Sequence, residues 1–193
     1  MSTKKINIKD LNTQEFYQLP KVLIWDKRYR EGLSDGAKLL YMIIRDRFSL
    51  SIHTAQKQSE SGEPVSYQDQ NGDIFCVLDN VEISFTLNKA VKTVINYIKE
   101  LADLNLISIT EIAGGANRIY LNQLESNTTS LAHFLGERDF FKHVHSCKKK
   151  GKEITKTLEE CIKAQVQKRE NNDSAINSNT DIPSGEDTTP PGM

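Results

Sequence analysis

Hydrogen-bond donors gather along one side of a helical pattern near the middle of the chain. Apolar residues recur there at steps of three and four, which predicts a helix from Lys89 to about Asp103 with Asn88 as its N-cap. The apolar stripe comprises Ala90, Val91, Val94, Ile95, Ile98, Leu101 and Ala102. The opposite side carries Lys89, Lys92, Thr93, Asn96 and Lys99. Such side chains donate to phosphate oxygens or to base edges in a major groove, which indicates DNA recognition.

A shorter helical pattern precedes this helix and predicts a helix-turn-helix. Asp79 is a suitable N-cap for a helix of under two turns, and the two helices are expected to join at Thr86-Leu87-Asn88. Val81, Ile83 and Phe85 are expected to supply the apolar contacts of the first helix. The second helix of such a motif reads the major groove with its N-terminal residues.

A hairpin pattern follows the second helix. Residues 106–110 alternate as in a strand, 112–117 contain a Gly-Gly turn, and 118–121 form a second strand. Asn117 and Arg118 are expected to reach toward an adjacent groove or phosphate. The order predicts an α+β fold, a winged helix-turn-helix with a small antiparallel sheet, followed by a helical basic extension and a disordered tail.

The local charge leaves an alternative open. Residues 79–125 hold four basic and six acidic side chains, a net of 4 − 6 = −2. The same residues are therefore also compatible with a small core whose polar face is only solvated, or with a winged-helix module that binds protein and not DNA. Two basic blocks flank this region, since residues 1–48 have a net charge of +4 and residues 138–170 of +5, and either block can add phosphate contacts.

The segments before the helix-turn-helix are expected to support it. Ser34 is the predicted N-cap of a helix whose apolar stripe runs from Ala37 to Phe48. Residues 53–72 lack a sustained period and predict a long solvent loop inserted in the domain. Residues 73–78 predict a strand that pairs with the hairpin into a three-stranded sheet, with Cys76 in the core.

Four regions are predicted along the 193 residues. They are a flexible arm over 1–13, a winged-helix domain over 14–125, a charged helical extension interrupted at Gly151 over 126–170, and a disordered acidic tail over 171–193. The start of the chain lacks the apolar run of a signal peptide, and no segment reaches the length of a membrane span. We therefore expect a cytoplasmic protein that does not bind membranes.

Residues that signal catalysis or cofactor binding are scarce. His143, His145 and Cys147 alternate, and Cys161 is a further candidate ligand, but the spacing matches no common zinc pattern, and Lys148–Lys150 would repel a cation. Gly114-Gly115 matches neither a dinucleotide fingerprint nor a P-loop. Three cysteines form no paired framework, which favours free thiols. We expect no enzyme, no metal and no cofactor.

The chain resembles the N-terminal domain of the RepA_N family, the theta-type plasmid replication initiators of low-GC Gram-positive bacteria. The resemblance covers about residues 14–124, and residues 33–51 are its most specific part. It rests on Phe16-Tyr17-Gln18-Leu19-Pro20-Lys21, Leu33 to Tyr41, Asp46-Arg47-Phe48-Ser49-Leu50-Ser51, Lys92-Thr93 to Lys99-Glu100-Leu101, and Asn105-Leu106-Ile107.

The resemblance implies a winged-helix domain that binds repeated double-stranded DNA sites at a plasmid origin, usually as a homodimer, in the cytoplasm of a bacterium. By position, Lys89, Lys92, Thr93 and Asn96 fall on the recognition helix and Asn117 and Arg118 on the wing. Family members often carry a larger C-terminal domain that engages host replication proteins such as primase, from which this chain departs. A transcriptional regulator of a plasmid or phage is the alternative within DNA binding.

Overall fold

The computed structural model describes residues 16–112, 116–125 and 128–177. The chain forms two compact units, residues 1–126 and residues 127–193, and each is described by itself. The predicted arm over 1–13, the Gly-Gly tip of the hairpin and the tail beyond residue 177 lie outside the described residues. In the described part, no helix has both the length and the apolar character needed to cross a membrane.

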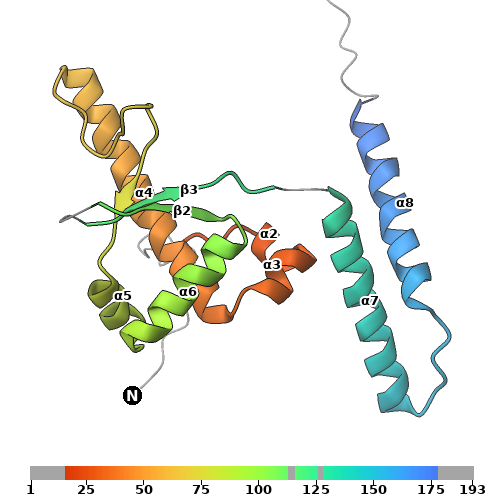
Figure 1. Ribbon diagram of the computed structural model, residues 1–193. Helices are drawn as coiled ribbons and strands as arrows, with labels where there is room; N and C mark the ends of the chain where they lie inside the picture. Colours follow the sequence, from red (N-terminus) through yellow and green to blue (C-terminus); the bar gives the residue numbers. More distant parts are fainter. Residues whose placement is uncertain (1–15, 113–115, 126–127, 178–193) are drawn as a thin grey trace, which may run out of the picture. The chain divides into compact units, whose positions relative to one another are not determined.

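Helices and a small sheet make up the first unit (Figure 1). Two short helices near its start were not predicted, and Asp26 caps the second of them by accepting the N–H of Arg28 at 3.0 Å. In chain order the elements are α2 (Val22–Trp25), α3 (Lys27–Gly32), α4 (Asp35–Ser61), β1 (Cys76–Val77), α5 (Asn80–Leu87), α6 (Val91–Asp103), β2 (Ile107–Thr110) and β3 (Arg118–Leu121).

The central helix α4 begins as predicted. The Ser34 hydroxyl accepts the N–H of Ala37 at 3.2 Å, so Ser34 is the N-cap. Ala37, Leu40 and Ile44 are completely buried on one stripe of the helix. Burying each such leucine or isoleucine contributes about 1.5–3 kcal/mol relative to exposure, so this stripe anchors the unit.

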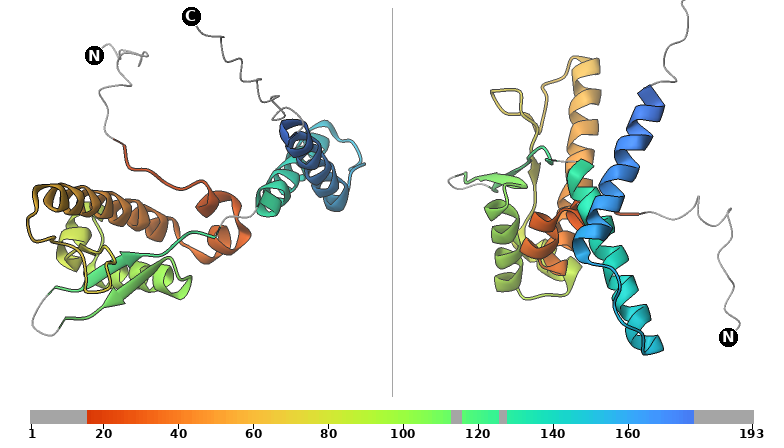
Figure 2. Two further views of the ribbon diagram at one scale, coloured as in Figure 1. Left: turned by 90° about the horizontal axis from the view of Figure 1, so that it is seen from above. Right: turned by 90° about the vertical axis from the view of Figure 1, so that its right-hand side faces the viewer.

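The predicted solvent loop over 53–72 is wrong in its first half, because α4 continues to Ser61. Ala55 and Ser51 remain buried on the continuing helix, and residues such as Gln and Lys propagate helix readily although they lack an apolar period. Gly62 ends the helix in the left-handed conformation, with φ of 71°. The end of α4 and the returning chain extend beyond the sheet (Figures 1 and 2).

The predicted three-stranded sheet is confirmed. Strand β3 lies in the middle, antiparallel to both neighbours, in the order β1-β3-β2. Ile119 of β3 pairs with Cys76 on one side and with Ile109 on the other. Cys76 is completely buried in β1, which confirms its prediction as a core residue. Burial raises the pKa of its thiol to about 11, because the thiolate would be desolvated.

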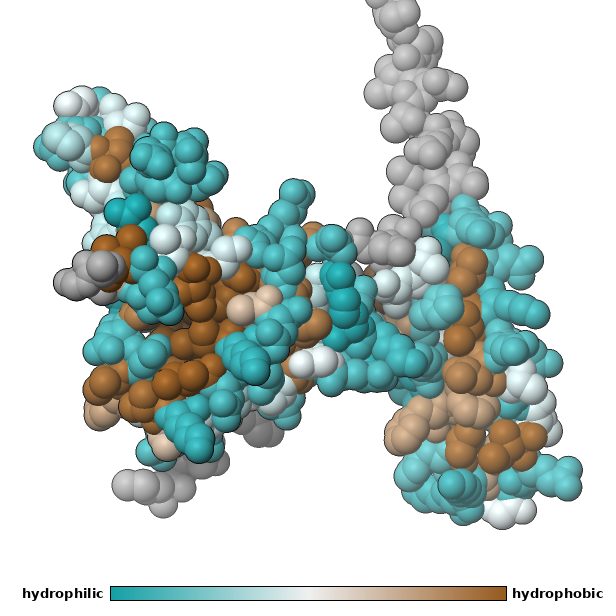
Figure 3. Space-filling view, viewed as in Figure 1, coloured by the Kyte–Doolittle hydropathy of each residue, from teal (hydrophilic) through white to brown (hydrophobic). Residues whose placement is uncertain are grey.

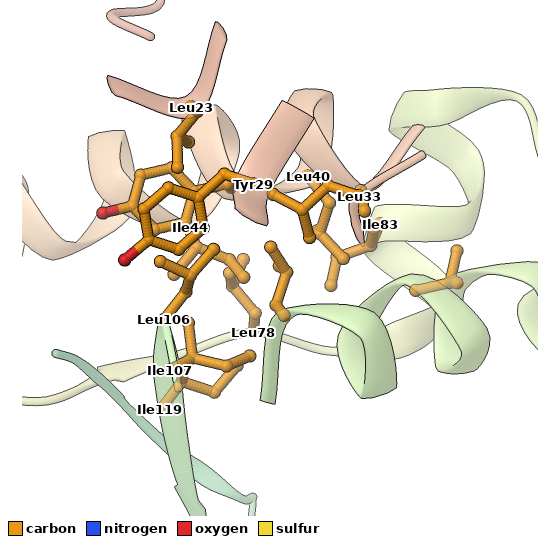
Figure 4. Packing of buried hydrophobic residues seen from close by; sticks show 14 of the residues in the cluster. Leu23, Tyr29, Leu33, Leu40, Ile44, Leu78, Ile83, Leu106, Ile107 and Ile119 are labelled. Atoms are coloured by element: carbon orange, nitrogen blue, oxygen red, sulfur yellow. The ribbon is translucent and has the colours of Figure 1, made fainter. Parts of the chain in front are cut away.

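One hydrophobic core joins the helices to the sheet (Figure 4). Leu40 and Ile44 of α4 meet Leu106, Ile107 and Ile119 from β2 and β3 and the residues that precede them. Helix α6 contributes Val94 and Leu101 to the same cluster, and both side chains are fully buried. The orientation of α6 is therefore determined by packing on α4 and the sheet.

The second unit is an antiparallel pair of helices, α7 (Thr128–Lys150) and α8 (Leu158–Asn177), which lie side by side in Figures 1 and 2. The predicted interruption at Gly151 is confirmed, since this residue has φ of 60° and follows α7. The predicted start of the tail at residue 171 is wrong, because α8 continues through residues 171–177. A helix that is already nucleated continues through polar residues at low cost.

The crossing of α7 and α8 depends on Gly136. A Cβ atom at this position would lie 2.6 Å from the backbone Cα of Ile162, closer than real Cβ contacts allow. Gly136 is buried, so the two helix backbones approach each other at this residue. A hydrogen bond from Gln165 to Asp139 at 2.6 Å adds a polar link near the crossing.

Gly136→Ala is therefore expected to loosen the hairpin. The forced separation of the helices should cost about 1–3 kcal/mol, which outweighs the gain of about 0.5–1 kcal/mol in helix propensity. Hydrogen exchange of the α7 and α8 amides in the full chain would measure the loss of protection. The exposed Lys148→Ala substitution is the control, and equal protection in both variants would contradict the close crossing.

Candidate nucleic-acid interface

The turn between α5 and α6 is built by hydrogen bonds of the backbone and of Ser84. The Asp79 carboxylate accepts the N–H of Val81 at 3.1 Å, which confirms Asp79 as the N-cap of α5. At the other end of α5, the N–H of Lys89 donates to the Ser84 carbonyl, and the Ser84 hydroxyl donates to the Lys89 carbonyl at 2.6 Å. These bonds hold the turn that connects the two helices.

The predicted start of the recognition helix at Lys89 is wrong. Asn88 lies in the left-handed conformation, with φ of 50°, and is the C-cap of α5, whereas α6 begins at Val91 with Ala90 as its N-cap. Asparagine is favoured at N-caps and also tolerates the left-handed C-cap, so the residue type alone was ambiguous. Lys89 consequently lies exposed in the turn and not on the helix.

Ala90 supplies no side-chain hydrogen bond to the first turn of α6. Helix N-termini present N–H donors and the positive end of the helix dipole. Lys89 lies directly before this end and Lys92 in the first turn after it. The start of α6 thus combines backbone donors with two lysines, a combination suited to a phosphate oxygen.

The exposed side of α6 mixes polar and apolar residues. At 100° per residue, seven exposed side chains of α6 fall within one continuous arc. Ala102 and Asp103 lie in the last turn of the helix, and the other five precede them. These five are Val91, Lys92, Ile95, Asn96 and Lys99, which we call the outer face of α6. Thr93 is half-buried at the border of this arc. The structure therefore brings Lys92 and Asn96 together, with Thr93 beside them and Lys89 in the adjoining turn.

The predicted apolar stripe of α6 is only partly buried. Of its seven residues, Val94 and Leu101 are fully buried, Ile98 is partly buried, and Ile95 is 50% exposed. Tyr97, which was not assigned to the stripe, packs against the core instead. At 100° per residue the predicted stripe spans only about 140°, but the arc that packs on the core is shifted toward Tyr97, so Val91 and Ile95 at the opposite edge stay exposed.

The predicted apolar contacts of α5 are confirmed only for one of three residues. Ile83 is buried, but Val81 is 61% and Phe85 is 87% exposed. Residues two apart point in nearly opposite directions on a helix, so Val81, Ile83 and Phe85 cannot all face one core. Figure 3 shows hydrophobic side chains gathered on the surface over α5 and α6.

The wing is the β2–β3 hairpin, and its two predicted site residues differ in setting. Asn117 is exposed just before β3. Arg118 is partly buried on β3, where its guanidinium carbon lies 4.4 Å from the ring centroid of Phe75. This cation–π contact holds Arg118 against the β1 side of the sheet. Arg118 thus has a structural contact that the sequence pattern did not indicate.

Three contacts fix α6 and α5 on α4. The backbone N–H of Ser34 donates to the Glu100 carboxylate at 2.8 Å, which joins the start of α4 to the end of α6. A Cβ atom on Gly36 would overlap the Tyr97 ring, so the ring packs directly on the α4 backbone. Arg47 forms an ion pair with Glu82 of α5. These contacts hold the helix-turn-helix as one piece with its outer face exposed.

The histidines and cysteines of α7 do not converge on one point. Cys147 Sγ lies 3.6 Å from His143 Nε2, whereas His145 stacks on Phe141. Among the residues that the structure describes, no group of three or more His, Cys, Asp or Glu side chains is arranged to hold a metal ion.

Several known structures are similar to this chain. One described as "Structure of MDR initiator" is 24% identical with a TM-score of 0.49 and covers 78% of this chain and 100% of its own. "N-Terminal domain of DNA binding protein" is 24% identical, with a TM-score of 0.49 and coverages of 79% and 99%. "Structure of Rep-DNA complex" is 24% identical, with a TM-score of 0.48 and coverages of 78% and 98%. No curated protein matches the chain.

A family model gives the decisive comparison. The model for the replication initiator protein A (RepA) N-terminus matches residues 15–134, which include every described element of the first unit and the start of α7. The match agrees with the resemblance carried by residues 14–124 of the sequence. The chain therefore belongs to the RepA_N family of replication initiator proteins.

Proposed function

We propose that this chain is a non-enzymatic initiator protein that binds repeated double-stranded DNA sites in a plasmid origin. The observation that carries the proposal is the outer face of α6, which exposes Lys92 and Asn96 side by side at the start of the second helix of a helix-turn-helix. Membership of the RepA_N family supports initiation of replication as the purpose of this binding. Host replication proteins such as primase are the expected later partners.

Each part of the outer face has a role in this proposal. Asn96 is able to pair with an adenine through two hydrogen bonds, and Lys92 with a guanine or a phosphate. Val91 and Ile95 offer apolar contacts of the kind that thymine methyl groups accept. Lys89, in the turn, and Asn117, on the wing, contribute phosphate contacts that position the domain without reading sequence.

Arg118 has a smaller role than its position in the sequence suggested. Its guanidinium stacks on Phe75, so reaching a phosphate would require giving up that contact. We therefore assign Arg118 to the support of the wing and Asn117 to the phosphate contact. The net charge of −2 over residues 79–125 makes the local lysines the main electrostatic attraction within the helix-turn-helix.

Exposed apolar residues on α5 favour a second candidate function, in which the winged helix binds protein. Phe85 is almost fully exposed and Val81 lies one turn before it. Large exposed apolar side chains of this kind are costly in water unless a partner covers them. Within the main proposal the partner is a second copy of the chain, since a homodimer would match paired half-sites in repeated DNA.

Charge reversal at the start of α6 tests the DNA site. The full chain is titrated against duplexes from its own coding sequence and against scrambled duplexes at several salt concentrations. Lys89→Glu with Lys92→Glu should weaken binding to the native duplex and flatten the slope of log K against log salt by roughly two units, because about two phosphate contacts are lost. Fluorescence anisotropy measures both quantities.

The matched control is Lys27→Glu with Lys57→Glu, which changes the charge equally at exposed positions on α3 and α4. The site on α6 would be contradicted if Lys89→Glu with Lys92→Glu left the affinity for the native duplex unchanged. It would also be contradicted if the control pair lowered this affinity equally. A wild-type chain that prefers no duplex would favour the protein-binding function.

Phe85→Ser tests the homodimer. The variant lacks the ring that the dimer interface would bury. The sedimentation coefficient of the full chain should therefore shift from that of a dimer to that of a monomer. Leu50→Ser is the control, since Leu50 is also an exposed large apolar residue but lies on α4. A wild-type chain that sediments as a monomer, or a Phe85→Ser variant that stays dimeric, would contradict this interface.

A further inference from the structure

Helix α7 presents an aromatic ring among lysines on one side of the hairpin. Phe141 is 71% exposed, and its ring stacks on His145 with centroids 6.5 Å apart and planes inclined by 14°. These two rings and their neighbours line a shallow hollow of about 530 Å³. The lining residues, which we call the basic-aromatic face, are Phe141, Lys142, His145, Ser146, Lys149 and Lys150.

The charged residues that line this face are all lysines, and Glu137 lies one turn before Phe141. Residues 140–152 contain five lysines and no aspartate or glutamate. Asp139, the acid next to this stretch, is already bound, since its carboxylate accepts hydrogen bonds from Arg138 and Gln165. Arg138 and Gln165 together lower the pKa of Asp139. The face is therefore a concentrated positive patch on a chain whose net charge is only −1.

The connection between the helices is held away from this face. His143 Nε2 accepts the backbone N–H groups of Thr155 and Lys156, both at 3.3 Å. His143 points about 200° around the helix from Phe141 and from His145, so the connection lies on the other side of α7. The buried Cys147 and the Gly136 crossing also belong to the side that packs on α8. Within the described residues of the helix pair, neither α8 nor the connection covers the basic-aromatic face.

We propose that the basic-aromatic face binds single-stranded nucleic acid. The lysines would contact successive phosphates, and the exposed Phe141 ring, supported from behind by His145, would stack on an unpaired base. In a duplex the base faces are already stacked on each other, so the exposed ring would find no partner there. A membrane surface fits less well, since Phe141 is the one large apolar side chain on the face.

This site is separate from the one proposed on α6. The RepA_N match ends at residue 134, before the first residue of the basic-aromatic face, so family membership assigns nothing to it. The two sites also differ in ligand, because α6 is proposed to read a duplex and α7 to hold a single strand. Either proposal can therefore fail without the other.

The experiment measures binding of the full chain to a fluorescein-labelled thymidine oligonucleotide, which does not pair with itself, and to a duplex of equal length. Phe141→Ala should weaken single-strand binding about tenfold through lost stacking and leave duplex binding unchanged. Phe141→Tyr should restore single-strand affinity, whereas Phe141→Leu should not, because leucine is apolar but cannot stack. Lys149→Glu with Lys150→Glu should weaken binding and flatten the salt slope by about 1.4 units.

The controls separate stacking from charge. Lys163→Glu with Lys168→Glu changes the charge equally at exposed positions of α8 and should have little effect. Heparin, a polyanion without bases, should bind the wild type and Phe141→Ala equally. The proposal is overturned if Phe141→Ala binds the oligonucleotide like the wild type, if Phe141→Leu restores affinity, or if the α8 control loses as much as the α7 pair.

Discussion

The burial of α6 against α4 is the constraint on which the candidate DNA interface depends. Val94 and Leu101 are completely buried in the cluster that contains Leu40 and Ile44. Once these side chains are buried, the rotation of α6 about its axis is set, and the remaining arc of the helix must face outward. The Ser34–Glu100 hydrogen bond and the packing of Tyr97 on Gly36 fix the same helix at further points. The side chains proposed to contact DNA are therefore positioned by buried apolar residues that do not contact DNA themselves.

Much of this architecture was predictable because local patterns and tertiary packing agree. Ser34 has the right type and place for an N-cap, and the three strands carry apolar residues that a core can bury, so both predictions are confirmed. The end of α4 was missed because no apolar period marks residues 56–61. The turn at Asn88 was misassigned because asparagine is favourable at either helix end, and only the left-handed backbone distinguishes the two.

The candidate site was predictable in its polar residues and not in its apolar ones. Lys92 and Asn96 lie together because helical spacing alone places them on one arc. Val91, Ile95 and Phe85 were expected to face the core, and their exposure depends on which arc α4 covers, which the sequence does not state. Arg118 shows the same limitation, since Phe75, its stacking partner, lies more than forty residues away in the sequence. Long-range packing decides which side chains of a local motif remain available to a ligand.

Site-specific photocrosslinking measures most directly whether the outer face of α6 reads DNA. A photoreactive amino acid replaces Asn96 in one variant and the exposed Gln56, on the far part of α4, in another. Each variant is irradiated with a duplex from the chain's own coding sequence or with a scrambled duplex. If the outer face of α6 reads DNA, position 96 forms a crosslink that maps to specific bases of the native duplex and is weak with the scrambled one. Equal crosslinking from both positions, or none from position 96 while the complex forms, would contradict this role of the outer face.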